Sequence, residues 1–207
     1  IQMLACEDWM PVPSVFDPCN DVAVVEDTLD LSDAVIYTYD TDSGTLTHPD
    51  QGVLPHISVV LNGVRVVVAG NLIVGNGATL RAEGGSPLML ASWGDIAIAG
   101  TLDVSSSADD GEGAGANSDA CSAPEPGTSE EQGGGGGGGG AFGDDGGDGG
   151  AGRNGSNAGG AKGSKLGTFG LHGGCEGGDG GLGDGDDGDQ RQQEGRSGAL
   201  LLAPCLH

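Results

Sequence analysis

The sequence is poor in positive charge: seven Lys and Arg stand against 31 Asp and Glu, and the net charge is −24. Nucleic acids and anionic membrane surfaces are recognised through basic patches, so neither is an expected partner. Cations such as calcium could act as counter-ions. The acidic residues also keep a glycine-rich chain soluble without binding anything, which is the simpler interpretation.

The chain also lacks an apolar run long enough to span a membrane and shows no complete signal peptide. Its five cysteines form no C-x-x-C pair, which leaves zinc and thioredoxin chemistry without support. Cys6 and Cys19 bracket a Pro-rich segment, whereas Cys121 and Cys175 bracket most of a glycine-rich tract. We therefore expect two disulfides, with Cys205 left over, and an extracellular or cell-surface location.

No catalytic constellation is visible. Asp95 and Asp103 lie at opposite ends of two adjoining strand-like stretches; β-helical polysaccharide enzymes use paired carboxylates, but solvated acids at the edges of the rungs are the favoured interpretation. Residues 159–164 lack the spacing of a phosphate-binding loop. The histidines are scattered, and none adjoins a serine or cysteine in a catalytic frame: His48, His56, His172 and His207. The sequence therefore predicts a protein that is not an enzyme and has no cofactor.

Proline is absent between Gly143 and Gly173, which rules out collagen although every third residue is small. Eight of the eleven positions in this column are Gly and the others are Ala or Ser, whereas the other twenty positions hold five glycines. The column consists of Gly143, Gly146, Gly149, Gly152, Gly155, Ala158, Ala161, Ser164, Gly167, Gly170 and Gly173.

This column favours a bundle of short, polyglycine-II-like helices with three residues per turn, packed where no Cβ fits. A disordered Gly/Asp linker is the alternative that composition supports. The tract has few apolar anchors, among them Leu166, Phe169 and Leu171, so backbone hydrogen bonds and a covalent tie would have to order it. Valine should then be tolerated at Gly147 or Gly150, outside the column, and not at Gly149 or Gly152.

Acidic residues gather at the end of the tract, at Asp184, Asp186, Asp187 and Asp189. They could bind calcium weakly, although the calcium-binding nonapeptide pattern is not matched and no distal acid completes a cage. Asp40–Gly44 superficially follows a calcium-loop spacing as well. It lies between Val35–Tyr39 and Thr45–Thr47, which predicts a β-hairpin closed by an Asp/Gly turn.

From Ile57 to Val104, short strands with alternating apolar residues recur at a spacing of 22–24 residues, with glycine at the corners. This repeat predicts a β-solenoid of the parallel β-helix type, with a small β-sandwich as the alternative. The matched pairs are Val66 with Leu88 and Leu80 with Leu102, 22 apart, and Leu72 with Ile96 and Val74 with Ile98, 24 apart. The expected core is Leu72, Val74, Leu88, Leu90, Ile96, Ile98 and Leu102.

Asn71–Val74 and the stretch Gly94–Asp103, followed directly by a glycine-rich tract, resemble glycine-rich secreted or cell-surface proteins of myxobacteria and related bacteria. The G-D-I-x-I-x-G-x-L-D pattern is similar to rungs of β-helical adhesins of the filamentous-haemagglutinin type. The resemblance covers about residues 37–190 and implies a right-handed β-helix and surface display, with no catalytic residues. In that pattern further rungs follow the glycine tract; here one apolar strand follows, in residues 198–205.

Together these features predict an all-β chain in five parts. They are an irregular segment (1–35), a hairpin with solenoid rungs (36–108), an acidic linker (109–132), the glycine-rich segment (133–190) and a tail with one apolar strand (191–207). The leading function is a non-catalytic extracellular structural or adhesive surface protein, whose partners are other copies of itself or surface polymers. A calcium-responsive surface protein and a β-helical carbohydrate-active enzyme are the alternatives.

Overall fold

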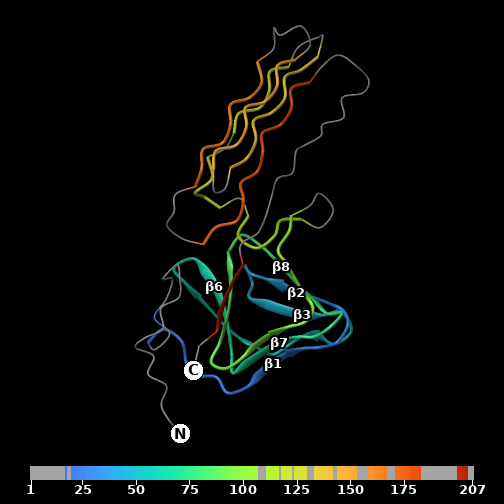
Figure 1. Ribbon diagram of the computed structural model, residues 1–207, viewed down its shortest axis with the longest axis vertical. Coiled ribbons are helices and arrows are strands. Elements are labelled where there is room, and N and C mark those ends of the chain that lie inside the picture. Colours follow the sequence, from blue (N-terminus) through green and yellow to red (C-terminus); the bar gives the residue numbers. More distant parts are fainter. Residues whose placement is uncertain are drawn as a thin grey trace.

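The computed structural model of this 207-residue chain describes Asp17 and residues 20–106, 111–116, 118–122, 124–129, 133–141, 144–152, 158–166, 171–182 and, for the backbone, 200–204. In these residues the protein consists of β-strands and extended segments, with no helix. Figure 1 shows two halves: a β half below, and a glycine half above in which extended segments run side by side. The predicted all-β class is confirmed.

In the part of the chain that the structure describes, twelve strands form three sheets, which we call sheets A, B and C. Sheet A has the order β1–β7–β10, sheet B β11–β8–β2–β3–β4, and sheet C β12–β9–β6–β5. The strands are β1 (Thr28–Leu31), β2 (Ile36–Asp40), β3 (Thr45–His48), β4 (Gly52–Val53), β5 (Ile57–Leu61), β6 (Val64–Ala69), β7 (Asn71–Val74), β8 (Thr79–Glu83), β9 (Leu88–Ser92), β10 (Ile96–Ile98), β11 (Thr101–Asp103) and β12 (Leu200–Pro204).

The chain visits the sheets in a fixed order. Strands β6, β7 and β8 lie in sheets C, A and B, and β9, β10 and β11 then follow through the same three sheets. Each later strand pairs in parallel with the strand one circuit earlier, and β12 pairs in parallel with β9. Parallel strands need such long connections because a hairpin can join only antiparallel strands.

The registers test the predicted repeat directly. Leu80 pairs with Leu102, and Leu72 with Ile96, as the spacings predict. The pairing of Val66 with Leu88 is wrong by one residue, because Leu88 pairs with Arg65. The offset between paired strands is therefore not constant: it is 22 residues in sheet B, 23 in sheet C and 24 in sheet A, because the corners between sheets use unequal numbers of residues.

Two hairpins attach antiparallel strands to this framework. The predicted hairpin of β2 and β3 is confirmed, and the Asp40 carboxylate accepts hydrogen bonds from the Asp42 and Ser43 amides in its turn. The hairpin of β5 and β6 turns at Asn62 and Gly63, whose φ angles are +50° and +79°. An Asn-Gly pair is a strong hairpin signal because both residues accept positive φ, so this turn is predictable from the sequence.

The core lies between the three sheets and includes most of the predicted residues. Leu72, Val74, Leu88 and Leu90 are buried, and Ile96 and Leu102 pack partly buried against them. Ile98 was expected in the core but is 37% exposed, because sheet A ends at β10 in the described residues. The core also contains Leu31, Tyr37, Tyr39, Leu46, Val67 and Leu80.

A second apolar cluster connects the halves. Val66 and Met89 on β6 and β9 are fully buried, and Leu171 from the glycine half packs against their cluster. Residues 111–116 make a further junction: the Ala114 amide donates to Ala82 O at 3.0 Å. The glycine half is therefore joined to the β half both by apolar contact and by backbone hydrogen bonds.

Candidate functional site

The feature that sets this chain apart is the packing of its glycine-rich segments. Four of them, residues 133–141, 144–152, 158–166 and 171–182, lie side by side in the glycine half with a fifth segment, residues 124–129, which contains a single glycine (Figure 1). We call residues 133–141, which contain the run of eight glycines, the central segment. The central segment is hydrogen-bonded to all four of the others.

These hydrogen bonds recur every third residue. In the central segment, the Gly136 and Gly139 amides donate to Gly150 O and Gly147 O at 2.8 and 2.7 Å. The other three neighbours follow the same interval: Gly135 and Gly138 donate to Thr128 and Glu125, Gly160 and Gly163 donate to Gly136 and Gly139, and Gly178 and Gly181 donate to Gly138 and Gly135. A period of three is the period of an extended helix with three residues per turn.

The close packing explains why residues 133–140 of the central segment are uninterrupted glycine. A Cβ on Gly137 would lie 1.9 Å from Gly178 O, and a Cβ on Gly138 would lie 2.0 Å from Ala161 O. A Cβ on Gly139 would lie 2.9 Å from Gly147 N. Three successive residues thus face three different backbones, so no side of the glycine run at these residues accepts a side chain.

The predicted small column is correct at Gly146 and Gly149. A Cβ on Gly146 or Gly149 would lie 2.1 or 2.0 Å from a carbonyl oxygen of the central segment, whereas at Gly147 and Gly150 it would meet nothing within 4 Å.

The column fails in residues 158–166, where Ala158, Ala161 and Ser164 are exposed and the buried glycines are Gly160 and Gly163. The hydrogen-bonded pairs Gly146–Gly163 and Gly149–Gly160 show that residues 144–152 and 158–166 run antiparallel. Because the chain direction is reversed in residues 158–166, a different set of every third residue faces inward there.

Side chains satisfy backbone amides at the outer edge of residues 158–166. The Lys165 amide donates to Asp145 Oδ1 at 2.9 Å, and the Lys162 amide donates to Asp148 Oδ1 at 3.2 Å. Lys162 Nζ also lies 3.3 Å from Asp145 Oδ2. The hydrogen bond from the Lys165 amide, with the Lys162 side chain, holds the pKa of Asp145 below its usual value.

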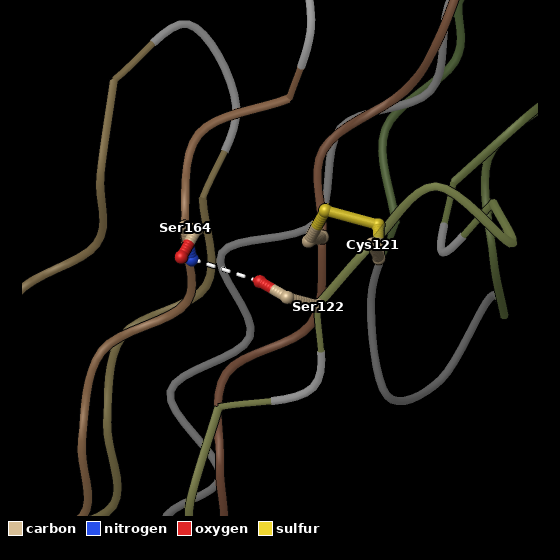
Figure 2. The surroundings of a disulfide bond; sticks show 4 residues. Cys121, Ser122 and Ser164 are labelled. Carbon is tan, nitrogen blue, oxygen red and sulfur yellow. Dashed lines mark hydrogen bonds between the residues drawn. A yellow bond between two sulfur atoms is a disulfide. The ribbon is translucent and has the colours of Figure 1, made fainter.

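The disulfide Cys121–Cys175 closes this site, as predicted from the cysteine positions. Its Cα atoms lie 5.6 Å apart, its ends are separated by 54 residues, and Cys175 is buried. Figure 2 shows the adjacent Ser122, whose Oγ accepts a hydrogen bond from the Ser164 amide at 2.8 Å. The covalent tie and the side-chain hydrogen bond therefore fix the start of the glycine half to two of its later segments. Cys6, Cys19 and Cys205 lie outside the described residues.

Two grooves open on the surface of the described protein. One of about 650 Å³ lies beside the disulfide, and its lining includes the acidic residues Asp119, Glu176 and Asp179. The other, of about 450 Å³, has apolar walls that include Leu29 and Ile57, from β1 and β5. The excess of acidic residues in the first groove disfavours anionic ligands there.

The structure also shows where the acidic residues singled out in the sequence lie. Within the part of the chain that the structure describes, no cluster of three or more His, Cys, Asp or Glu side chains is placed to hold a metal ion. Asp103 forms an ion pair with Arg81 at 2.9 Å, while Asp95 is exposed. The proposed calcium ligands Asp184, Asp186, Asp187 and Asp189 lie outside the described residues.

His48 and His56 have structural contacts within the β half. His48 is buried, its Nδ1 accepts a hydrogen bond from the Asp50 amide at 3.0 Å, and its ring lies edge-on to Tyr37. His56 lies edge-on to Tyr39. Burial raises the pKa values of both tyrosines.

Among the residues that the structure describes, no helix could cross a membrane. Comparison with protein-family models, with curated proteins and with solved structures gives no match.

Proposed function

We propose that this chain is a non-catalytic structural or adhesive module of an extracellular surface, built from a β-solenoid and a polyglycine-II-like bundle. The observation that carries the proposal is the central segment, whose glycines face neighbouring backbones on every side. Such packing leaves no room for a ligand or for catalytic side chains within the bundle. It produces a rigid body from a chain with few apolar residues.

The solenoid is supported by the order of the strands. Three sheets are visited in turn, and strands one circuit apart pair in parallel with offsets of 22–24 residues. Strands β1 and β2 pair in the same sense with β7 and β8. A repeated circuit buries a continuous core by stacking, which is the principle of solenoid proteins.

An extracellular location is supported by the disulfide, because such bonds persist mainly in oxidising compartments. Other copies of the chain or surface polymers are the proposed partners, as in the glycine-rich surface proteins that the sequence resembles. The large excess of acidic residues disfavours nucleic acid and anionic membranes.

The test is localisation on intact cells of the source organism. An epitope-tagged full chain should be labelled by antibody on unbroken cells, and purified chain should release no products from neutral or acidic polysaccharides. Labelling only after lysis would refute surface display, and hydrolysis would assign the chain to the enzymes. Circular dichroism with and without calcium tests the alternative of a calcium-responsive surface protein, which predicts a spectrum that changes when calcium is added.

A further inference from the structure

Sheet A ends at strand β1. Among the described residues β1 pairs with β7 alone, whereas sheet B continues beyond β2 with the antiparallel strands β3 and β4. Figure 1 shows β1 beside β7 at the lower side of the β half. In the part of the chain that the structure describes, the outer edge of β1 therefore has no strand partner, and we call it the free edge.

The backbone groups at the free edge belong to two residues. Leu31 O accepts a hydrogen bond from the Gly75 amide at 3.0 Å, so it points toward β7. Successive residues of a strand direct their N–H and C=O groups to alternate edges, so those of Thr28 and Asp30 point away from β7. Residues two apart on a strand are separated by about 6.6 Å, which is also the repeat of any extended chain laid alongside.

The apolar groove of about 450 Å³ adjoins the start of the free edge. His56 lines it, but its two ring nitrogens each lie 3.0 Å from a backbone carbonyl oxygen, of Leu54 and of Gly44. The ring is therefore already engaged within the chain. The rest of the lining is mainly apolar and consists of Val25, Leu29, Pro55, Ile57, Val68 and Ala69, so the groove suits an apolar side chain.

A strand added at the free edge would extend both faces of β1. On the inner face Leu31 is buried and Leu29 partly buried, so the inward side chains of the added strand should be apolar. On the outer face Asp30 is exposed, and so are Glu26 and Asp27 just before the strand. Opposite charges on neighbouring strands stabilise a sheet and like charges destabilise it, so the outward side chains should be basic.

We propose that the free edge of β1 and the adjoining groove bind an extended, basic segment of a partner protein, which adds to sheet A as a strand. Backbone hydrogen bonds attach the strand, and the groove and the acidic residues select its side chains. At this edge a second copy of the chain is disfavoured, because each copy carries a net charge of −24. A small ligand is disfavoured because the free backbone groups form a row and do not converge.

This partner is additional to the copies and surface polymers proposed above, and its test does not depend on where the chain is located. The test measures the fluorescence polarisation of a short, labelled peptide in which Val and Lys alternate, mixed with the full chain at about 0.15 M salt. The wild-type chain should bind this peptide. It should bind neither the matching Val/Glu peptide nor the Val/Lys peptide with all its backbone nitrogens methylated, which keeps the charge but cannot donate hydrogen bonds.

Thr28→Pro is the first variant, because it removes an outward N–H and leaves the charge of the chain unchanged. Proline is tolerated at the first residue of an edge strand. The variant should bind the Val/Lys peptide about tenfold more weakly, which corresponds to the loss of about one hydrogen bond.

Ile57→Lys is the second variant, in case the first fails to fold, and places a positive charge in the groove. Its matched control is Val60→Lys on the same strand: the two residues are 50% and 49% exposed, but Val60 does not line the groove. Val60→Lys should bind as the wild type does, and Ile57→Lys much more weakly. Equal binding by these two variants, binding of the methylated peptide, or no binding by the wild type would overturn the proposal. Self-association of the chain that Thr28→Pro abolishes would assign the free edge to a second copy instead.

Discussion

Neighbouring glycines in residues 144–152 have opposite surroundings although nothing in their identity distinguishes them. Gly149 faces the carbonyl oxygen of Gly136 across a gap too small for a Cβ, and Gly150 faces open space. Neither has positive φ, so the backbone conformation at both positions admits an L side chain. Any difference between substitutions there must come from packing.

Valine should therefore be tolerated at Gly150 and not at Gly149. Gly149→Val must push residues 144–152 away from the central segment and break backbone hydrogen bonds, each worth about 0.5–1.5 kcal/mol net. Amide hydrogen exchange should show lost protection across the bundle in Gly149→Val and wild-type protection in Gly150→Val. Coil-like exchange in the wild type, or identical exchange in both variants, would mean that the segments are not packed.

A second residue-scale contrast lies in the β half, where Leu90 is buried and Ile98 is 37% exposed. Leu90→Ala should reduce the free energy of unfolding by about 2–5 kcal/mol, because it leaves a cavity in the core. Ile98→Ala is the control and should cost less, since much of its side chain already contacts solvent. Denaturant unfolding of both variants checks this, and equal losses would place Ile98 in the core after all.

At the scale of elements, the glycine half is ordered by backbone contacts that recur every third residue rather than by apolar burial. Its outer amides lack a neighbouring backbone, and carboxylate or hydroxyl side chains accept their hydrogen bonds instead. The order of residues 158–166 is therefore linked to the ionisation of Asp145, which accepts from Lys165 and pairs with Lys162.

This linkage predicts a loss of order in acid. The folded-state pKa of Asp145 is lowered from 3.8, so its contribution is complete above that value and is lost as the pH falls through the lowered pKa. Hydrogen exchange of the Lys165 amide should accelerate below about pH 4, beyond the intrinsic pH dependence. Asp145→Asn, which cannot ionise, should abolish the acid-dependent part of the change at Lys165. An unchanged acid response in that variant would exclude Asp145 as its source.

At the scale of the whole molecule, two different kinds of stabilisation meet at one junction. The β half has two apolar clusters, whereas the glycine half has backbone hydrogen bonds, the disulfide and the contact of Leu171 with the β half. The halves should therefore respond differently to reduction, because only one of them contains the described covalent tie.

Reduction of Cys121–Cys175 should make residues 122–174 sensitive to protease while residues 57–104 stay protected. A disulfide that closes a loop of this size stabilises by about 4 kcal/mol in the chain-entropy model, and the glycine half has little apolar burial to replace it. Limited proteolysis with fragment mapping, with and without reductant, measures this. The double variant Cys121→Ser/Cys175→Ser should behave like the reduced chain. Identical digestion in all states would show that the disulfide does not protect residues 122–174.

Much of the fold could be predicted from local patterns. Alternation of apolar residues predicts strands and their faces wherever a core is present, and Asp40–Gly44 predicts a hairpin through turn chemistry. The period of three predicts close packing at Gly146 and Gly149, and the spacing of Cys121 and Cys175 predicts their bond. Each of these features depends on residues near one another in sequence, or on the closure of a single loop.

The sequence by itself thus determined the all-β class and the glycines at which no side chain fits, Gly146 and Gly149. The reason is that backbone geometry imposes a period of two on strands and a period of three on the extended helices. Only the tertiary structure decided the partner of Val66, since corners of unequal length shift the register from sheet to sheet. It also decided that Gly160 and Gly163 replace Ala158 and Ala161 as inward residues, and that Ile98 is partly exposed. These outcomes depend on which segment lies alongside, and a chain reversal or the end of a sheet changes that neighbour without any local signal.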